Sequence, residues 1–173
     1  TEILIDPKMA FGTGSHPTTR LCMEIAEELE LMGKTVLDCG CGSGIISIAC
    51  VKLGASGAYG FDNDPFSVEN ASENAIINQV QDKTSFIEAD ICGIDVKNYD
   101  IVFANIISGT LMECLGRFHE FCSVQGKIVF SGLLAEEEEY FISGLTGNGF
   151  IPLEVRRLGE WIAVLAGRAT ENS

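Results

Sequence analysis

Short runs of apolar and β-branched residues alternate along most of this chain with longer segments whose composition is helical. The short runs have the length of buried strands, and the longer segments have that of helices covering a sheet. The predicted strands are 34–37, 58–61, 84–88, 99–104 and 127–130. The predicted helices begin after Thr19 and continue at 45–53, 65–78, 108–121 and 135–145. This alternation predicts an α/β fold with a mainly parallel sheet covered on both faces.

The two ends of the chain add different elements to this pattern. Near the start, the run Ile3-Leu4-Ile5 is strand-like. At the other end, 151–156 and 161–166 flank Leu158-Gly159-Glu160 and predict an antiparallel hairpin. Five parallel strands and this hairpin give a seven-stranded sheet. No repeat or linker divides residues 1–173, so we expect one domain.

The segment VLDCGCGSG, Val36 to Gly44, joins the first parallel strand to its helix. Glycines at 40, 42 and 44 let a ligand approach bare backbone, and the helix beyond offers unpaired N–H groups. The spacing GxGxG differs from the GxGxxG of dinucleotide sites, because Ile45 replaces the third glycine. Asp38 places a carboxylate where a diphosphate would be repelled and an ammonium group attracted. The loop therefore favours S-adenosylmethionine over NAD, unless it merely closes a strand–helix unit.

Polar residues follow the other predicted strands. Asp62 lies 22 residues after Gly40, close to the ~20 at which an acid binds ribose hydroxyls in doubly wound nucleotide sites. Asp64, before Pro65, is explained by a structural role as a helix N-cap. Asp90 and Asn105 end the next two strands. Because carboxyl ends of parallel strands share one edge, these residues and Asp38 are predicted to converge on one crevice.

The loop FGTGSHPTT, residues 11–19, is too rich in glycines, hydroxyls and other polar groups for a simple connector. Its candidate cofactor contacts are Phe11, Thr13 and His16. Two simpler roles stay open: Thr18 or Thr19 as the N-cap of the following helix, and His16 as a hydrogen-bonding loop residue. That helix has an apolar face formed by Leu21, Cys22, Ile25, Ala26 and Leu29.

Composition limits the classes of function. Hydrophobic residues make up 46 %, yet no run is long enough to cross a bilayer and no signal segment is visible, so we expect a soluble, cytoplasmic protein. A net charge of −14 disfavours nucleic-acid binding and suits a basic protein partner, although acidity also simply favours solubility. The seven cysteines are odd in number and scattered, which predicts buried thiols in a reducing compartment. Cys39 and Cys41 alone make a poor metal site, so no metal is expected.

Together, the motifs FGTGSHPTT, DCGCGSG, FDNDP and FANII, with GEWIAVLAGR near the C-terminus, resemble the methyltransferases that modify ribosomal large-subunit protein eleven (L-eleven). The resemblance spans nearly the whole chain. It implies a Rossmann-like class I methyltransferase sheet and S-adenosylmethionine-dependent methylation of amino groups on that ribosomal protein, with S-adenosylhomocysteine as product. By motif alignment, Thr19, Gly40, Asp62 and Asn105 resemble cofactor-contacting positions.

The resemblance also implies a substrate-recognition domain before the segment that begins at Ile3, and this sequence is expected to lack it. Substrate assignment is therefore weaker than cofactor assignment. The alternatives are methylation of another protein lysine or of a small molecule, or a non-catalytic cofactor-binding module. Nucleic-acid methylation is disfavoured, since Asn105-Ile106-Ile107 lacks the prolines and aromatic of an NPPY-type motif.

The predicted chemistry needs a neutral amine aligned with the methyl group. Asn105 is the candidate catalytic residue, orienting either the acceptor or the methionine end of the cofactor. His16 is a weaker candidate for a base. Desolvation and the positive sulfonium lower the pKa of the amine, and positioning supplies roughly 7–11 kcal/mol, so no dedicated base is required.

Overall fold

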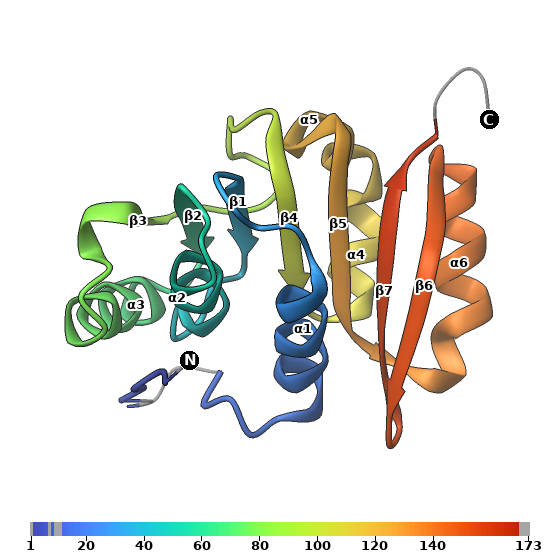
Figure 1. Cartoon of the computed structure of the whole chain (residues 1–173). Helices are drawn as coiled ribbons and strands as arrows, with labels where there is room; N and C mark the ends of the chain where they lie inside the picture. Colours follow the sequence, from blue (N-terminus) through green and yellow to red (C-terminus); the bar gives the residue numbers. More distant parts are fainter. Residues whose placement is uncertain (1, 7, 9–11, 170–173) are drawn as a thin grey trace.

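The computed structural model describes residues 2–6, 8 and 12–169. Seven strands form one sheet in the order β3-β2-β1-β4-β5-β7-β6 (Figure 1). Strands β1 to β5 pair in parallel, and β7 runs antiparallel to both β5 and β6. The strands are β1 Thr35–Cys39, β2 Gly57–Asp62, β3 Thr84–Glu88, β4 Tyr99–Asn105, β5 Cys122–Leu134, β6 Phe150–Leu158 and β7 Trp161–Arg168. The predicted fold class is confirmed, including the C-terminal hairpin.

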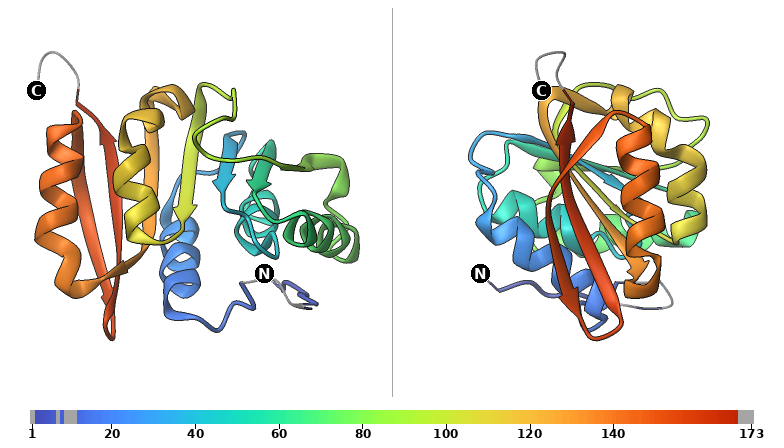
Figure 2. Two further views of the ribbon diagram at one scale, coloured as in Figure 1. Left: turned by 180° about the vertical axis from the view of Figure 1, so that it is seen from behind. Right: turned by 90° about the vertical axis from the view of Figure 1, so that its right-hand side faces the viewer.

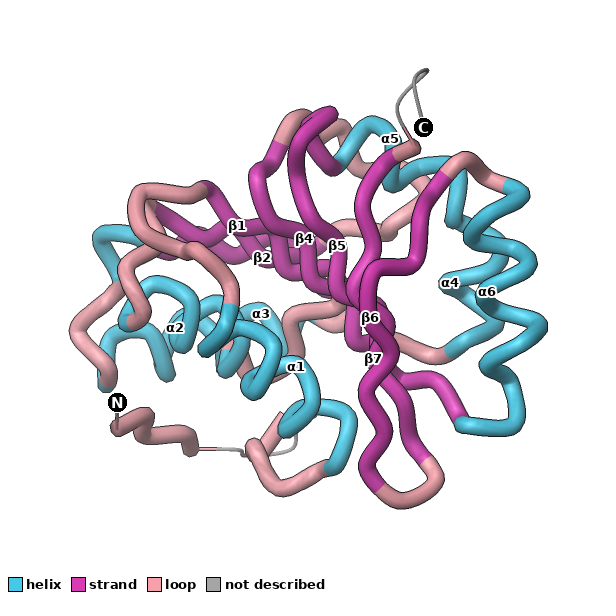
Figure 3. The backbone as a smooth tube through the Cα atoms, turned by 45° about the vertical axis from the view of Figure 1, so that its right-hand side comes forward, coloured by secondary structure: helices cyan, strands magenta, loops and turns pink. Residues whose placement is uncertain are grey.

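Helices cover both faces of the sheet (Figures 2 and 3). Helices α1 Pro17–Glu28, α2 Ile45–Lys52 and α3 Pro65–Ile77 lie on one face. On the other lie α4 Ser108–Cys114, α5 Phe118–Phe121 and α6 Glu138–Gly147. Three single 3₁₀ turns complete the elements: Gln81–Lys83, Leu115–Arg117 and Ala135–Glu137.

The prediction of one continuous helix over 108–121 is wrong. The helix is interrupted by the 3₁₀ turn Leu115–Arg117, and α5 resumes at Phe118. Gly116 in this turn is a weak helix former, which lowers the cost of the interruption.

The core consists of two apolar layers separated by the sheet. Neighbouring residues of β4 belong to different layers: Val102 packs into the layer under α4 to α6, and Phe103 into the layer under α1 and α2. Both are fully buried, as expected for a central strand of a parallel sheet. Within the described residues, no helix has the length and apolar character needed to span a membrane.

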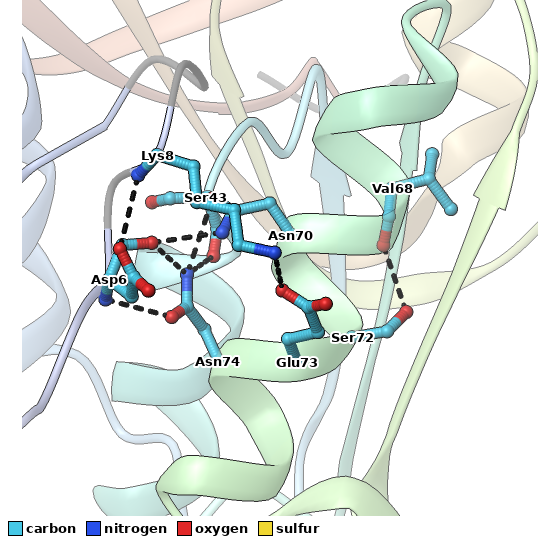
Figure 4. A network of polar contacts seen from close by, with 8 residues as sticks. All are labelled: Asp6, Lys8, Ser43, Val68, Asn70, Ser72, Glu73 and Asn74. Carbon is cyan, nitrogen blue, oxygen red and sulfur yellow. Dashed lines mark hydrogen bonds and ion pairs between the residues drawn. The ribbon is translucent and has the colours of Figure 1, made fainter.

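Residues 3–5 do not form the predicted strand, because they pair with none of the strands of the sheet. The backbone here instead pairs with side-chain amides of the segment from α3 to its C-cap. Leu4 N donates to Asn78 Oδ1 at 3.0 Å, and Asn78 Nδ2 donates to Leu4 O at 2.6 Å. Asp6 N donates to Asn74 Oδ1 at 2.9 Å, and Asp6 O accepts from Asn70 Nδ2 at 2.9 Å (Figure 4). These three asparagines are buried and take the place of a neighbouring strand.

The N-caps of α1 and α3 show which residues begin these two helices. The N-cap of α1 is His16, whose Nδ1 accepts from Thr18 N at 3.3 Å, so neither Thr18 nor Thr19 takes the N-cap role that was left open for them. Pro17 then takes the first helical position. The predicted cap of α3 is confirmed: Asp64 accepts from Phe66 N at 3.1 Å.

Candidate functional site

The loop between β1 and α2 is built on glycines with left-handed backbone. The φ angles are +70° at Gly40, +51° at Gly42 and +78° at Gly44, a region that side chains rarely adopt. A Cβ atom at Gly40 would also overlap the side chain of Ile106. The loop is pinned to the next strand, because the N–H groups of Gly40 and Cys41 both donate to Phe61 O, at 2.9 and 3.0 Å. The backbone is thus bare and fixed where the strand ends.

Asp62, at the end of β2, closes this loop from the other side. Its Oδ2 accepts from Gly42 N at 3.0 Å, and its Oδ1 accepts from Asp64 N at 3.0 Å. An ionised carboxylate offers about four acceptor positions, so each oxygen retains capacity for a ligand hydroxyl. Asp62 therefore organises the loop and still presents a hydrogen-bond acceptor.

A cavity of about 650 Å³ opens at the carboxyl ends of β1, β2 and β4. This volume suits a small-molecule ligand. Strands β1 and β4 are neighbours in the sheet, but the chain continues from β1 toward one edge of the sheet and from β4 toward the other. The cavity lies at this point, which is the usual ligand position in doubly wound sheets. Six of the predicted site residues line it: His16, Gly40, Gly42, Asp62, Asp90 and Asn105.

Other predicted residues lie outside the cavity lining. Thr13 is exposed, and its hydroxyl pairs with Ser15 Oγ at 2.7 Å. Thr19 is buried behind the lining, where its Oγ1 lies 3.5 Å from Asn105 Nδ2. Gly44 packs beside Ala71 of α3. Phe11 lies outside the described residues.

Asp38 is buried beneath the glycine loop rather than exposed in the cavity. Its Oδ2 accepts from Ser47 N at 3.2 Å and from Ser47 Oγ at 2.7 Å, so it binds the first turn of α2. Its Oδ1 is buried with no hydrogen-bond partner among the described residues. Burial raises the pKa of Asp38 to about 6, although the two Ser47 hydrogen bonds partly oppose the shift. Through these contacts Asp38 holds the first turn of α2 in place.

Several cavity residues carry no recognisable signal in the sequence. Trp161, the first residue of β7, meets His16 edge to face with ring centroids 5.0 Å apart, which brings the distant hairpin to the rim. Gly132 adopts φ +82°, and a Cβ there would overlap the backbone of Ile106. The hairpin prediction placed Trp161 on a strand, but only sheet order reveals that this strand reaches the cavity.

The cysteines do not form an evident metal site. Across residues 2–6, 8 and 12–169, no group of three or more histidine, cysteine or acidic side chains is arranged to hold a metal ion. Six cysteines are buried, as predicted, but Cys92 is exposed, so the prediction is wrong for that residue. It lies in the turn after β3, where the chain leaves the sheet.

Comparison with known proteins identifies the family. Residues 1–169 match the family model described as ribosomal protein L11 methyltransferase (PrmA). The chain belongs to this family. The resemblance seen in the motifs is thereby confirmed over nearly the whole chain.

Matches to relatives in the L11 methyltransferase family cover most of this chain but little more than half of each relative. The chain is 40 % identical to the ribosomal protein L11 methyltransferase of Pelobacter propionicus over 172 residues, covering 95 % of this chain and 55 % of the relative. It is 42 % identical to that of Alteromonas mediterranea over 165 residues, covering 94 % of this chain and 55 % of the relative. The chain thus spans about half the length of the curated relatives it matches.

Solved structures agree with this assignment. A ribosomal protein L11 methylase from Lactobacillus delbrueckii subsp. bulgaricus superposes with a TM-score of 0.89 at 30 % identity, covering 96 % of this chain and 84 % of that one. A TehB-like SAM-dependent methyltransferase from Corynebacterium glutamicum, at 16 % identity, has a TM-score of 0.69 over 85 % of this chain and 86 % of its own. The second likeness shows the fold alone.

Proposed function

We propose that this chain transfers methyl groups from S-adenosylmethionine to amino groups of ribosomal protein L11, in the cytoplasm. The observation that carries the proposal is the hydrogen bond between Asp62 and Gly42 of the glycine loop, since both residues line the cavity. The chain also belongs to the L11 methyltransferase family. The cavity has the volume for a nucleoside-sized ligand. The apolar and acidic side chains that line it suit the uncharged base, the ribose hydroxyls and the positively charged sulfonium of S-adenosylmethionine.

The cofactor-binding roles follow from what each residue presents to the cavity. Gly40 and Gly42 give bare backbone against which the ligand packs, and Asp62 would accept hydrogen bonds from ribose hydroxyls. Asp90 presents a second carboxylate beside the apolar side chain of Ile91, a combination suited to the polar edge and flat face of a base. These roles support S-adenosylmethionine over a dinucleotide, because the described residues that line the cavity include no lysine or arginine to face a diphosphate.

S-Adenosylmethionine supplies a methyl group activated by a positive sulfonium. The protein has to present an amine without its proton, and an ordinary lysine with a pKa near 10.4 is neutral in only about one part in 2500 at pH 7, a cost of roughly 4.6 kcal/mol. Asn105 lies at the end of β4 in the cavity, where an amide can accept from the amine and hold its lone pair in line. The apolar residues Ile106 and Ile107 beside it lower the local polarity, which favours the neutral amine.

The acceptor is proposed to be basic. The chain has a formal net charge of −14, so a basic ribosomal protein is attracted to it, with a reach limited by the Debye length of about 8 Å in physiological salt. Ile107 is 74 % exposed at the cavity rim and offers an apolar contact for the aliphatic part of a lysine.

The direct test is transfer of label. Purified chain, S-adenosylmethionine labelled in its methyl group and recombinant L11 are incubated together, and the labelled protein is digested to locate modified amines. Label on lysine side chains or the N-terminal amine of L11 is expected, with little on an equally basic unrelated ribosomal protein. Cofactor binding without transfer to any protein would contradict the proposal and point to a non-catalytic module.

A further inference from the structure

Two cysteine thiols outside the glycine loop lie against each other. Cys92 Sγ is 3.1 Å from Cys114 Sγ, although the residues are 22 positions apart. Cys92 is exposed in the turn after β3, and Cys114 is the buried last residue of α4. A disulfide has an S–S length near 2.0 Å, so the two sulfurs need to approach by only about 1 Å to bond.

Both thiols are attached to walls of the cavity. Cys92 N donates to Asp90 Oδ1 at 2.8 Å, and Asp90 and Ile91 line the cavity directly before it. On α4, Thr110 lines the cavity one turn before Cys114 and therefore lies on the same side of the helix. A bond between the sulfurs would connect the segment after β3 to α4.

A third contact already holds the Cys92 segment in place. The guanidinium of Arg117, just beyond α4, donates to Cys92 O and, at 2.6 Å, to Ile94 O. Because one side chain binds two carbonyls of the turn, the turn is kept beside α4 before any bond forms. The thiol pair is thus preorganised rather than a chance approach of two mobile groups.

We propose that Cys92 and Cys114 form a reversible disulfide that links two cavity walls and weakens binding of the cofactor. The effect on the cofactor rests on the proposed function, whereas the disulfide does not. A low-molecular-weight disulfide such as oxidised glutathione is the oxidant. In a reducing compartment such a bond is transient and acts as a sensor.

The exchange proceeds in two steps. The Cys92 thiolate attacks one sulfur of the oxidant, which forms a mixed disulfide and releases one glutathione thiolate that takes up a proton. Cys114 loses its proton to solvent and attacks Cys92 Sγ, which forms the protein disulfide and releases the second glutathione. Two protein thiols are oxidised and one glutathione disulfide is reduced to two thiols. Burial and the adjacent Cys92 raise the pKa of Cys114, so the exposed Cys92 is the thiol that reacts first.

The expected effect on binding follows from the Cys92 N–H. Drawing Cys92 toward α4 shifts the donor that orients Asp90, so the contact of Asp90 with the ligand is weakened. Loss of one ordinary hydrogen bond corresponds to about a two- to tenfold weaker affinity.

The experiment treats the reduced full chain with oxidised glutathione at mildly alkaline pH, blocks free thiols and maps the peptides by mass spectrometry. A Cys92–Cys114 cross-link is expected in the wild type and in the control Cys50→Ser, which removes a buried thiol from α2. It should be absent from Cys92→Ser and Cys114→Ser. A wild type without this cross-link would overturn the inference.

Calorimetry with S-adenosylhomocysteine then compares oxidised and reduced protein. We expect the oxidised wild type to bind about two- to tenfold more weakly and the treated Cys92→Ser variant to bind as the reduced protein does. Unchanged affinity in the cross-linked protein would overturn the coupling. Absence of binding by the reduced wild type would instead contradict the proposed function, so the two failures are distinguishable.

Discussion

The carboxylate of Asp62 accepts a hydrogen bond from the amide nitrogen of Gly42, with 3.0 Å between Oδ2 and N. The acid at the end of β2 and the loop at the end of β1 are therefore one unit, and a ligand bound to either contacts both. This relationship makes Asp62 the most informative position for substitution, and Asp64, two residues later, offers a matched control.

Asp62→Ala should weaken binding of S-adenosylhomocysteine by roughly 10- to 150-fold, because hydrogen bonds that involve a charged group contribute ~1.5–3 kcal/mol. Asp64→Ala should instead lower the free energy of unfolding by about 0.5–2 kcal/mol, since Asp64 caps α3. Calorimetry measures the affinities and urea unfolding measures the stabilities. If Asp64→Ala abolished binding while Asp62→Ala retained it, the two roles would be reversed.

Gly40→Ala should both destabilise the protein and impair cofactor binding. The new Cβ has to adopt φ +70° and also overlaps Ile106, which forms part of the cavity wall. Gly33→Ala is the control, because Gly33 has φ +73° but no atom within 4 Å of the added Cβ. It should cost only the backbone strain of about 1–2 kcal/mol and leave affinity unchanged. Equal effects of the two substitutions on affinity would show that crowding at Ile106 is unimportant.

Asn105→Ala should lower kcat for L11 methylation by about a hundredfold, because a misplaced acceptor loses much of the benefit of alignment. Binding of S-adenosylhomocysteine should change much less than kcat. Asn63→Ala, which removes an amide from another part of the cavity lining, should leave kcat near the wild-type value. Single-turnover kinetics with purified L11 separates these effects. A normal kcat in Asn105→Ala would exclude the amide from the chemistry.

Asp38 should make stability depend on pH. Its folded pKa of about 6 is above the ordinary 3.8, so between these values the folded protein keeps a proton that the unfolded chain has released. Raising the pH through this window therefore favours unfolding, by about 3 kcal/mol in total at 1.36 kcal/mol per unit, and has no further effect above it. The free energy of unfolding of wild type minus that of Asp38→Asn should fall between pH 4 and pH 7. A difference independent of pH would contradict the raised pKa.

The parallel sheet could be predicted from the sequence alone, because its central strands are apolar on both faces and the helices between them have distinct starts. Asp62, Asp90 and Asn105 could be assigned to one crevice, since strand ends of a parallel sheet share an edge. Trp161 and Gly132 could not, because their approach to the cavity depends on where β7 and β5 lie in the sheet.

Side-chain contacts between segments distant in the sequence account for most of the remaining differences. A short apolar run such as 3–5 resembles a strand whether its backbone pairs with another strand or with side chains. Glu137 has nothing to distinguish it within four consecutive glutamates, yet its carboxylate accepts from Ser108 Oγ at 2.5 Å and from Leu134 N at 2.8 Å. It thereby joins the start of α4 to the end of β5. Such tertiary partners leave no periodic pattern in a sequence.

The asparagines of α3 and its C-cap also determine how the native state opens. Leu4 meets Asn78 across 74 residues, so this pairing can form only after α3 exists and is lost without disturbing the sheet. We therefore expect residues 2–6 to detach as a separate unit at a free energy below that of global unfolding. In native-state hydrogen exchange, the Leu4 amide should exchange through this local opening and the Val102 amide only when the central strand comes apart. Removing the partner with Asn78→Ala should speed exchange at Leu4 far more than at Val102.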